Sequence, residues 1–95
     1  MKAYVVANVH VENPSAFEDY RSRTAEVIEQ YKGRFLVRGG TVEVVEGDPG
    51  IGRLVILEVP SVEDARRFYD SPEYQAILPD RLNNAKSTLF VVDGV

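Results

Sequence analysis

The residues best suited to acid–base chemistry lie in the first apolar run of the chain. Its only histidine, His10, follows Asn8 by two residues among β-branched neighbours, so both side chains should lie on one face of a strand. Such a pair could orient a substrate and move a proton near neutral pH. The alternative is a histidine at a strand end that is exposed or bonded to a neighbour.

Arg38 is the strongest candidate for binding an anion. It stands directly before Gly39-Gly40, where missing side chains let the backbone bend and a ligand approach closely. A guanidinium fixed there could hold a carboxylate or an enolate oxygen through two parallel hydrogen bonds. The alternative is an ion pair with Glu46 or Glu58 that fixes the bend or a subunit contact.

Glu58 and Tyr74 complete the set of candidates. Glu58 lies near the end of the apolar run 54–59, so it is either a pocket acid with a raised pKa or a strand-end residue that reaches solvent. Tyr74 should pack its ring in the core while its hydroxyl looks into a cleft between helix and sheet. The candidate catalytic residues are therefore Arg38, His10 and Glu58, and the candidate ligand-binding residues are Asn8, Arg38 and Tyr74.

The composition excludes several classes of site and partner. There is no cysteine, which removes thiolate nucleophiles and cysteine-ligated metals, and one histidine is too few for the common zinc and non-haem iron sites. A single histidine is enough to hold haem, but no other residue points to one. Fifteen acidic and eleven basic residues give a net charge of −4 without a basic stripe. We therefore expect no cofactor and no nucleic-acid partner.

Length and the first residues define the domain and its expected compartment. Ninety-five residues make one domain, 1–95, and a domain this small without disulfides gains burial by oligomerising. Met1 leads into a short alternating run rather than a secretory or membrane-length apolar segment. We expect a cytoplasmic protein that does not associate with membranes.

The first half of the chain predicts two strands around one helix. Residues 3–11 form the first strand, and Asn13-Pro14 begins a helix that Gly33 should end in the left-handed conformation. Residues 35–46 read as one extended stretch, with Gly39-Gly40 as a bulge rather than the end of the strand. Residues 47–50 form the turn that follows.

The second half of the chain repeats this order. Residues 53–59 predict a third strand, and Ser61 has capping spacing to Asp64 at the start of a helix. Ser71-Pro72 restarts a short helical piece that Pro79 interrupts, before a closing strand at 88–92. This βαββαβ order predicts an α+β, ferredoxin-like domain with an antiparallel sheet.

Two strands are apolar on both faces, although the helices can cover only one face. These runs are Leu54–Leu57 and Leu89–Val92. An uncovered face would expose more apolar surface than monomers usually tolerate. We therefore expect a homodimer whose two sheets pack face to face.

Four segments together resemble the domain of unknown function (DUF) 1330 family: Phe35–Gly40, Glu46–Asp48, Glu58–Ser61 and Ser71–Tyr74. The resemblance runs from the first strand to Val95. It implies the dimeric α+β barrel fold, in agreement with the strands that are apolar on both faces. That superfamily includes cofactor-independent monooxygenases, muconolactone isomerases, haem-dependent chlorite dismutases and ligand-binding or stress-responsive proteins, so the resemblance does not imply one activity.

Three functions remain open from the sequence. The leading hypothesis is a homodimer that binds a small organic molecule in a helix–sheet cleft bordered by Arg38, Asn8, His10 and Tyr74. The second is a cofactor-independent monooxygenase or isomerase, acting on a small aromatic or carboxylic-acid substrate. In it, Arg38 steadies an oxyanion and His10 or Glu58 carries a proton. The third is a structural or regulatory dimer without a ligand.

Overall fold

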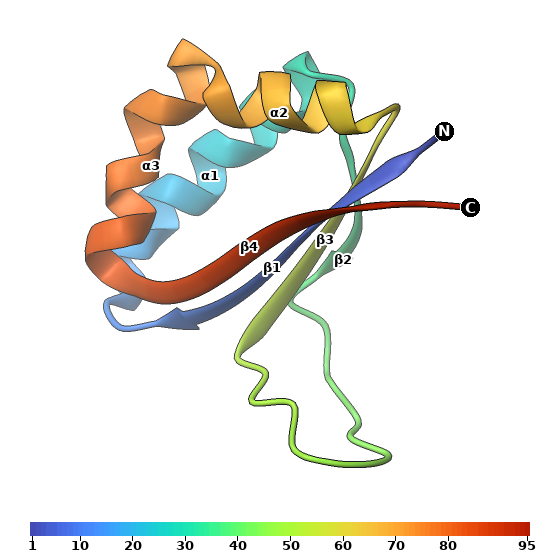
Figure 1. Ribbon diagram of the computed structural model, residues 1–95. Helices are drawn as coiled ribbons and strands as arrows, with labels where there is room; N and C mark the ends of the chain where they lie inside the picture. Colours follow the sequence, from blue (N-terminus) through green and yellow to red (C-terminus); the bar gives the residue numbers. More distant parts are fainter.

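The computed structural model describes all of residues 1–95 and has one antiparallel sheet with three helices on one face (Figure 1). The sheet order is β2-β3-β1-β4. The elements are β1 (Ala3–Val11), α1 (Pro14–Gln30), β2 (Arg34–Arg38), β3 (Arg53–Val59), α2 (Val62–Asp70), α3 (Pro72–Asn84) and β4 (Ala85–Asp93). This arrangement confirms the ferredoxin-like α+β fold, with α3 added between α2 and the last strand.

β1 lies inside the sheet and decides which residues face the helices. It pairs antiparallel with both β3 and β4. Ala3, Val5, Ala7 and Val9 are buried against the helices, whereas the residues between them point to the other face. The alternation predicted for residues 3–11 is confirmed.

α1 begins as predicted but ends differently. The Asn13 side chain accepts a hydrogen bond from the Ala16 amide at 3.4 Å, which caps the helix. At the other end Lys32, not Gly33, has the left-handed φ of +66°. Gly33 is required for space instead, because a Cβ there would lie 2.9 Å from Ile28 Cγ2.

β2 is shorter than predicted. The expected extended stretch 35–46 ends at Arg38, and the register shifts between Phe35 and Val37 rather than at the glycines. Gly39 has a φ of +71°, a conformation that cannot continue a strand. Residues 39–52 instead form a long loop that projects away from the body of the domain (Figure 1).

The two C-terminal helices follow their predicted caps. The amide of Asp64 donates to Ser61 Oγ at 3.1 Å, and the amide of Tyr74 donates to Ser71 Oγ at the same distance. Pro79 does not interrupt α3, because a proline removes only one backbone donor and the helix can continue on the remaining bonds. β4 consequently begins at Ala85, directly after α3.

The helix-facing side holds the core, and the other side of the sheet is uncovered. The core comprises sixteen buried apolar residues from β1, β3 and all three helices, with Ala85 of β4. On the opposite face Phe90 is 53% exposed and Val92 is 47% exposed. None of the helices is both long enough and apolar enough to cross a bilayer.

Candidate ligand-binding site

A small apolar pocket lies between α1 and the helix-facing side of the sheet. Its volume is about 60 Å³. Strand residues make one wall, among them Val5, Val55 and Leu57, and Phe17 of α1 makes part of the other. Twelve of the seventeen lining residues are hydrophobic. Such an apolar recess with a few polar groups is the usual form of a small-molecule site.

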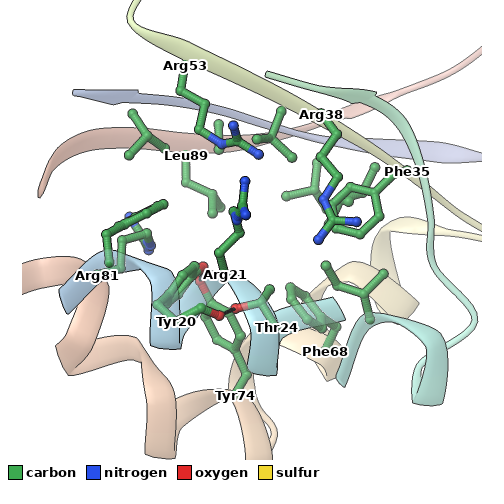
Figure 2. A pocket seen from close by; sticks show the side chains of 17 residues that line it. Tyr20, Arg21, Thr24, Phe35, Arg38, Arg53, Phe68, Tyr74, Arg81 and Leu89 are labelled. Carbon is green, nitrogen blue, oxygen red and sulfur yellow. Dashed lines mark hydrogen bonds between the residues drawn. The ribbon is translucent and has the colours of Figure 1, made fainter. Parts of the chain in front are cut away.

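Three neighbouring arginines line the pocket: Arg21 of α1, Arg38 of β2 and Arg53 of β3. Figure 2 shows the guanidinium groups of Arg21 and Arg53 pointing toward one another. Desolvation, and then the charges of Arg21 and Arg38, lower the pKa of Arg53. We call Arg21, Arg38 and Arg53 the arginine cluster.

The arginine cluster is short of negative charge. Arg21 pairs with Glu18 at 2.7 Å, but Arg38 and Arg53 make no ion pair. The Arg38 guanidinium instead lies over the Phe35 ring, 4.3 Å from its centroid. No aspartate or glutamate lines the pocket. The cluster is therefore suited to receive an anion.

The inner end of the pocket has a second polar group. Tyr20 and Tyr74 hydroxyls lie 2.7 Å apart, and Arg81 is buried beside them with its guanidinium 6.0 Å from the centre of the Tyr20 ring. Burial raises the pKa of Tyr74 far above its ordinary value, so its hydroxyl is neutral. We call Arg81, Tyr20 and Tyr74 the inner cluster.

Helix periodicity and capping hold the inner cluster in place. Tyr20 and Thr24 are one turn apart on α1, and the Thr24 hydroxyl donates to the Tyr20 carbonyl. Ser71 ends α2 and begins α3, which sets Tyr74 against Phe68 with ring centroids 4.6 Å apart. These packed aromatic contacts fix the hydroxyl at the pocket wall.

The structure separates the four residues expected to border one cleft. Arg38 and Tyr74 line the pocket. Asn8 and His10 lie on the opposite face of the sheet, because they alternate with the buried residues Ala7 and Val9. The predicted common border is therefore wrong for this pair.

Asn8 and His10 instead hold the long loop against the sheet. Asn8 Nδ2 donates to the Gly50 carbonyl at 3.1 Å, and Asn8 Oδ1 accepts from the Gly52 amide at 2.9 Å. His10 Nε2 lies 3.0 Å from the same Gly50 carbonyl oxygen. This is the bonded strand-end histidine that the sequence left open as the alternative.

Glu58 lies on the open face, away from the pocket. Its carboxylate is 3.2 Å from Lys2 Nζ and 3.1 Å from Arg34 Nε. Hydrogen bonds from Lys2 and then Arg34 outweigh desolvation and lower the pKa of Glu58, whereas a pocket acid would have had a raised pKa. Neither Glu58 nor Glu46 pairs with Arg38, so the expected structural ion pair is not formed.

Sequence reasoning did not identify four charged or phenolic residues of the pocket: Tyr20, Arg21, Arg53 and Arg81. Arg53 could have been found, because strand alternation places it on the same face as Val55. Helical spacing places the Tyr20 ring in the core, and that signal does not show that its hydroxyl reaches the pocket. Arg81 was missed because a helix interrupted at Pro79 would not have carried it inward.

No set of three or more histidine, cysteine, aspartate or glutamate side chains is grouped so that it could hold a metal ion. The polar groups of the pocket are guanidinium and hydroxyl groups, which suit oxyanions rather than cations.

A family model described as domain of unknown function (DUF1330) matches residues 2–95. The chain belongs to the DUF1330 family. The resemblance noted in the motifs is therefore confirmed over almost the whole chain. No curated protein matches the chain in sequence.

Solved structures share the fold of this DUF1330 chain at low identity. A Rhodopseudomonas palustris protein of unknown function has a TM-score of 0.78 and 18% identity, over 99% of this chain and 82% of its own. SnoaB, a cofactor-independent oxygenase from Streptomyces nogalater, has a TM-score of 0.71 and 18% identity, over 98% and 92%. A dimeric ferredoxin-like protein of unknown function from Jannaschia has a TM-score of 0.67 and 8% identity, over 99% and 100%.

Proposed function

We propose that this chain is a cytoplasmic homodimer that binds a small organic acid in the pocket between α1 and the sheet. The observation that carries the proposal is the lining of that pocket, in which four arginines and no acid surround an apolar recess. The ligand carboxylate would meet the arginine cluster, and its carbon body would fill the recess.

Charge favours an anion over a neutral ligand. The whole chain has a net charge of −4, yet every charged residue of the pocket is an arginine. Like charges held together in a partly dry site repel each other, and a bound carboxylate removes that repulsion. Two guanidinium groups can also hold one carboxylate through several charge-assisted hydrogen bonds.

Volume limits the ligand to a short one. A cavity needs roughly 10–15 Å³ to hold one water. The cavity of about 60 Å³ therefore has room for about four to six atoms of carbon or water size. The body of the ligand should be a chain of about four or five carbons, with its carboxylate at the arginine cluster.

The uncovered sheet face supports the homodimer. Phe90 and Val92 are about half exposed there, beside Val6 and Ile56 of the neighbouring strands. A second copy would cover this apolar patch, and the Jannaschia protein of the same fold is dimeric. The pocket lies on the other side of the sheet, so dimerisation would leave it open to ligand.

The binding claim is tested by calorimetric titration with hexanoate and with hexanamide, which has the same carbon chain without the charge. We expect binding of hexanoate, at least tenfold weaker binding of hexanamide, and at least tenfold loss for hexanoate in Arg38→Gln. Arg23→Gln is the control, because this exposed arginine is on α1 outside the pocket. Equal affinity for the acid and the amide would contradict the proposal.

One observation favours an enzyme as the second candidate. Arg81 and the Tyr20–Tyr74 hydroxyl pair could stabilise an oxyanion at the inner end of the pocket, and the fold is that of a cofactor-independent oxygenase. In this candidate Arg38 would steady the developing negative charge. The proton-carrying roles predicted for His10 and Glu58 would have to operate from the opposite face of the sheet.

Oxygen uptake tests the enzymatic candidate. A protein-dependent uptake with phenolic acids as substrates, abolished in Tyr74→Phe, would support it. His10→Gln and Glu58→Gln then test the proton carriers, because a loss of turnover without loss of binding is expected only if they take part. Binding of the same acids without any uptake would leave the protein as a binding protein.

A further inference from the structure

The pocket has a second cationic end, separate from the arginine cluster. Figure 2 shows Arg81 at one side of the pocket and Arg38 at the other, with Leu89 and Arg21 between them. A ligand held only by Arg38 and its neighbours would leave Arg81 without a partner. The inner cluster is therefore an additional recognition element.

Arg81 is a buried cation with no acidic partner. Its side chain is 4% exposed, its Nη1 donates to Ser87 Oγ, and its Nε has no hydrogen-bond partner. It also borders a wider groove beside Ser87, and no aspartate or glutamate lines that groove either. Buried arginines are almost always paired with an anion, because desolvating an unpaired charge is costly.

The neighbouring hydroxyls do not provide the missing negative charge. Tyr20 and Tyr74 hydrogen-bond to each other at 2.7 Å, and burial raises the pKa of Tyr74, so its hydroxyl carries no charge. They can rotate to donate to an incoming acceptor. The inner cluster thus offers one cation and a hydroxyl donor beside the apolar lining of the pocket.

We propose that the ligand is a dicarboxylate, with one carboxylate on the arginine cluster and the other on Arg81. This inference rests on the proposed function and adds the second acidic group. The apolar strip between the two ends accommodates about four carbons, which matches the spacer of adipate. The second carboxylate accepts hydrogen bonds from the Arg81 guanidinium and from one of the two tyrosine hydroxyls.

Adipate and hexanoate separate this inference from the binding claim, since both have six carbons and differ by one carboxylate. We expect the purified protein to bind adipate at least tenfold more tightly than hexanoate. Equal or weaker binding of adipate, with hexanoate still bound, would overturn the dicarboxylate inference and leave the proposed function intact. Failure to bind either acid would overturn both.

Substitution of Arg81 locates the second contact. In Arg81→Met the ratio of adipate to hexanoate affinity should fall to about one, whereas Arg23→Met, at an exposed arginine of α1 outside the pocket and the groove, should keep the ratio. Circular dichroism checks folding, and Tyr74→Phe gives a second test that removes only a hydroxyl. Tyr74→Phe should lower the ratio of adipate to hexanoate affinity at least threefold. A ratio unchanged in both Tyr74→Phe and a folded Arg81→Met would contradict the assignment.

Discussion

The hydroxyl oxygens of Tyr20 and Tyr74 lie 2.7 Å apart, although the two residues are 54 positions apart in the chain. Their hydrogen bond joins α1 to α3 at the inner end of the pocket. The rings also meet edge to face, with centroids 6.2 Å apart. The packing of these two helices and the shape of the pocket therefore depend on the same pair of side chains.

Removing both hydroxyls of this pair should cost less stability than the two single removals added together. Tyr74→Phe leaves the buried Tyr20 hydroxyl without its partner, which should lower the free energy of unfolding by about 1–2 kcal/mol. Tyr20→Phe/Tyr74→Phe should cost less than the sum of the single changes, because neither hydroxyl is left unpaired. Urea denaturation of the four proteins measures the coupling, and strictly additive losses would show that the hydroxyls do not support each other.

The Arg53 side chain should lower the free energy of unfolding of the protein while it contributes to binding of the ligand. Its guanidinium is partly desolvated beside Arg21 and Arg38, which is why its pKa is lowered. Arg53→Met should therefore raise the free energy of unfolding by about 0.5 kcal/mol, the size of one surface charge interaction, and weaken hexanoate binding. Thermal unfolding with and without hexanoate tests both effects. A variant that is less stable and binds as well as the parent would contradict the role of the cluster.

Glu58 should make stability depend on pH in the acid range. Its pKa is below the ordinary 4.5 in the folded chain because Lys2 and Arg34 donate to the carboxylate. The stabilisation is thus complete above about pH 4.5 and is lost as the pH falls through the lower folded pKa. The difference in Tm between the parent and Glu58→Gln should be present at pH 7 and should shrink below pH 4.5. Glu43→Gln, in the exposed loop, is the control, and a constant difference would argue against the ion pairs.

A charge on the open sheet face should separate the subunits. Phe90 is 53% exposed on the single chain, and a second copy would bury it. Phe90→Glu should therefore elute with the mass of a monomer in light scattering, whereas the parent elutes as a dimer. Val62→Glu, at the exposed first residue of α2, is the matched control and should stay dimeric. A monomeric parent protein would contradict the homodimer.

Lys32 should be replaceable by glycine with a gain in stability. Its φ of +66° lies in the left-handed region, which costs an L-residue about 1 kcal/mol and costs glycine almost nothing. Lys32→Gly should raise the free energy of unfolding by up to about 1 kcal/mol, reduced by the greater freedom of glycine in the unfolded chain. Thermal unfolding checks the sign, and a loss of stability would show that the Lys32 side chain contributes more than its backbone costs.

The fold could be predicted from the sequence because alternation and capping signals are local. Asn13-Pro14, Ser61 and Ser71-Pro72 each begin a helix where expected, and the strand at 53–59 has the predicted bounds. The predicted element boundaries are wrong where a proline or a glycine is compatible with either continuing or ending the element. Pro79 is tolerated inside α3, and Gly39 ends β2 instead of bending it.

The site was predicted only in part because its residues come from distant elements. Arg38 and Tyr74 were selected and line the pocket, but Arg81 reaches it only when α3 continues beyond Pro79. Asn8 and His10 were placed on the correct face relative to each other, yet the sequence does not show which face the helices cover. Which face of the sheet the helices cover depends on packing between elements rather than on the local sequence pattern.

Methyl NMR spectra of the protein titrated with hexanoate test the central claim most directly, because they locate the ligand. Leu57 and Leu89 line the pocket, whereas Ile56 and Val92 lie on the open face of the same strands. We predict saturable shifts for Leu57 and Leu89, none for Ile56 and Val92, and loss of the shifts in Arg38→Gln. Shifts confined to Ile56 and Val92, or shifts that persist in Arg38→Gln, would contradict binding of an organic acid in this pocket.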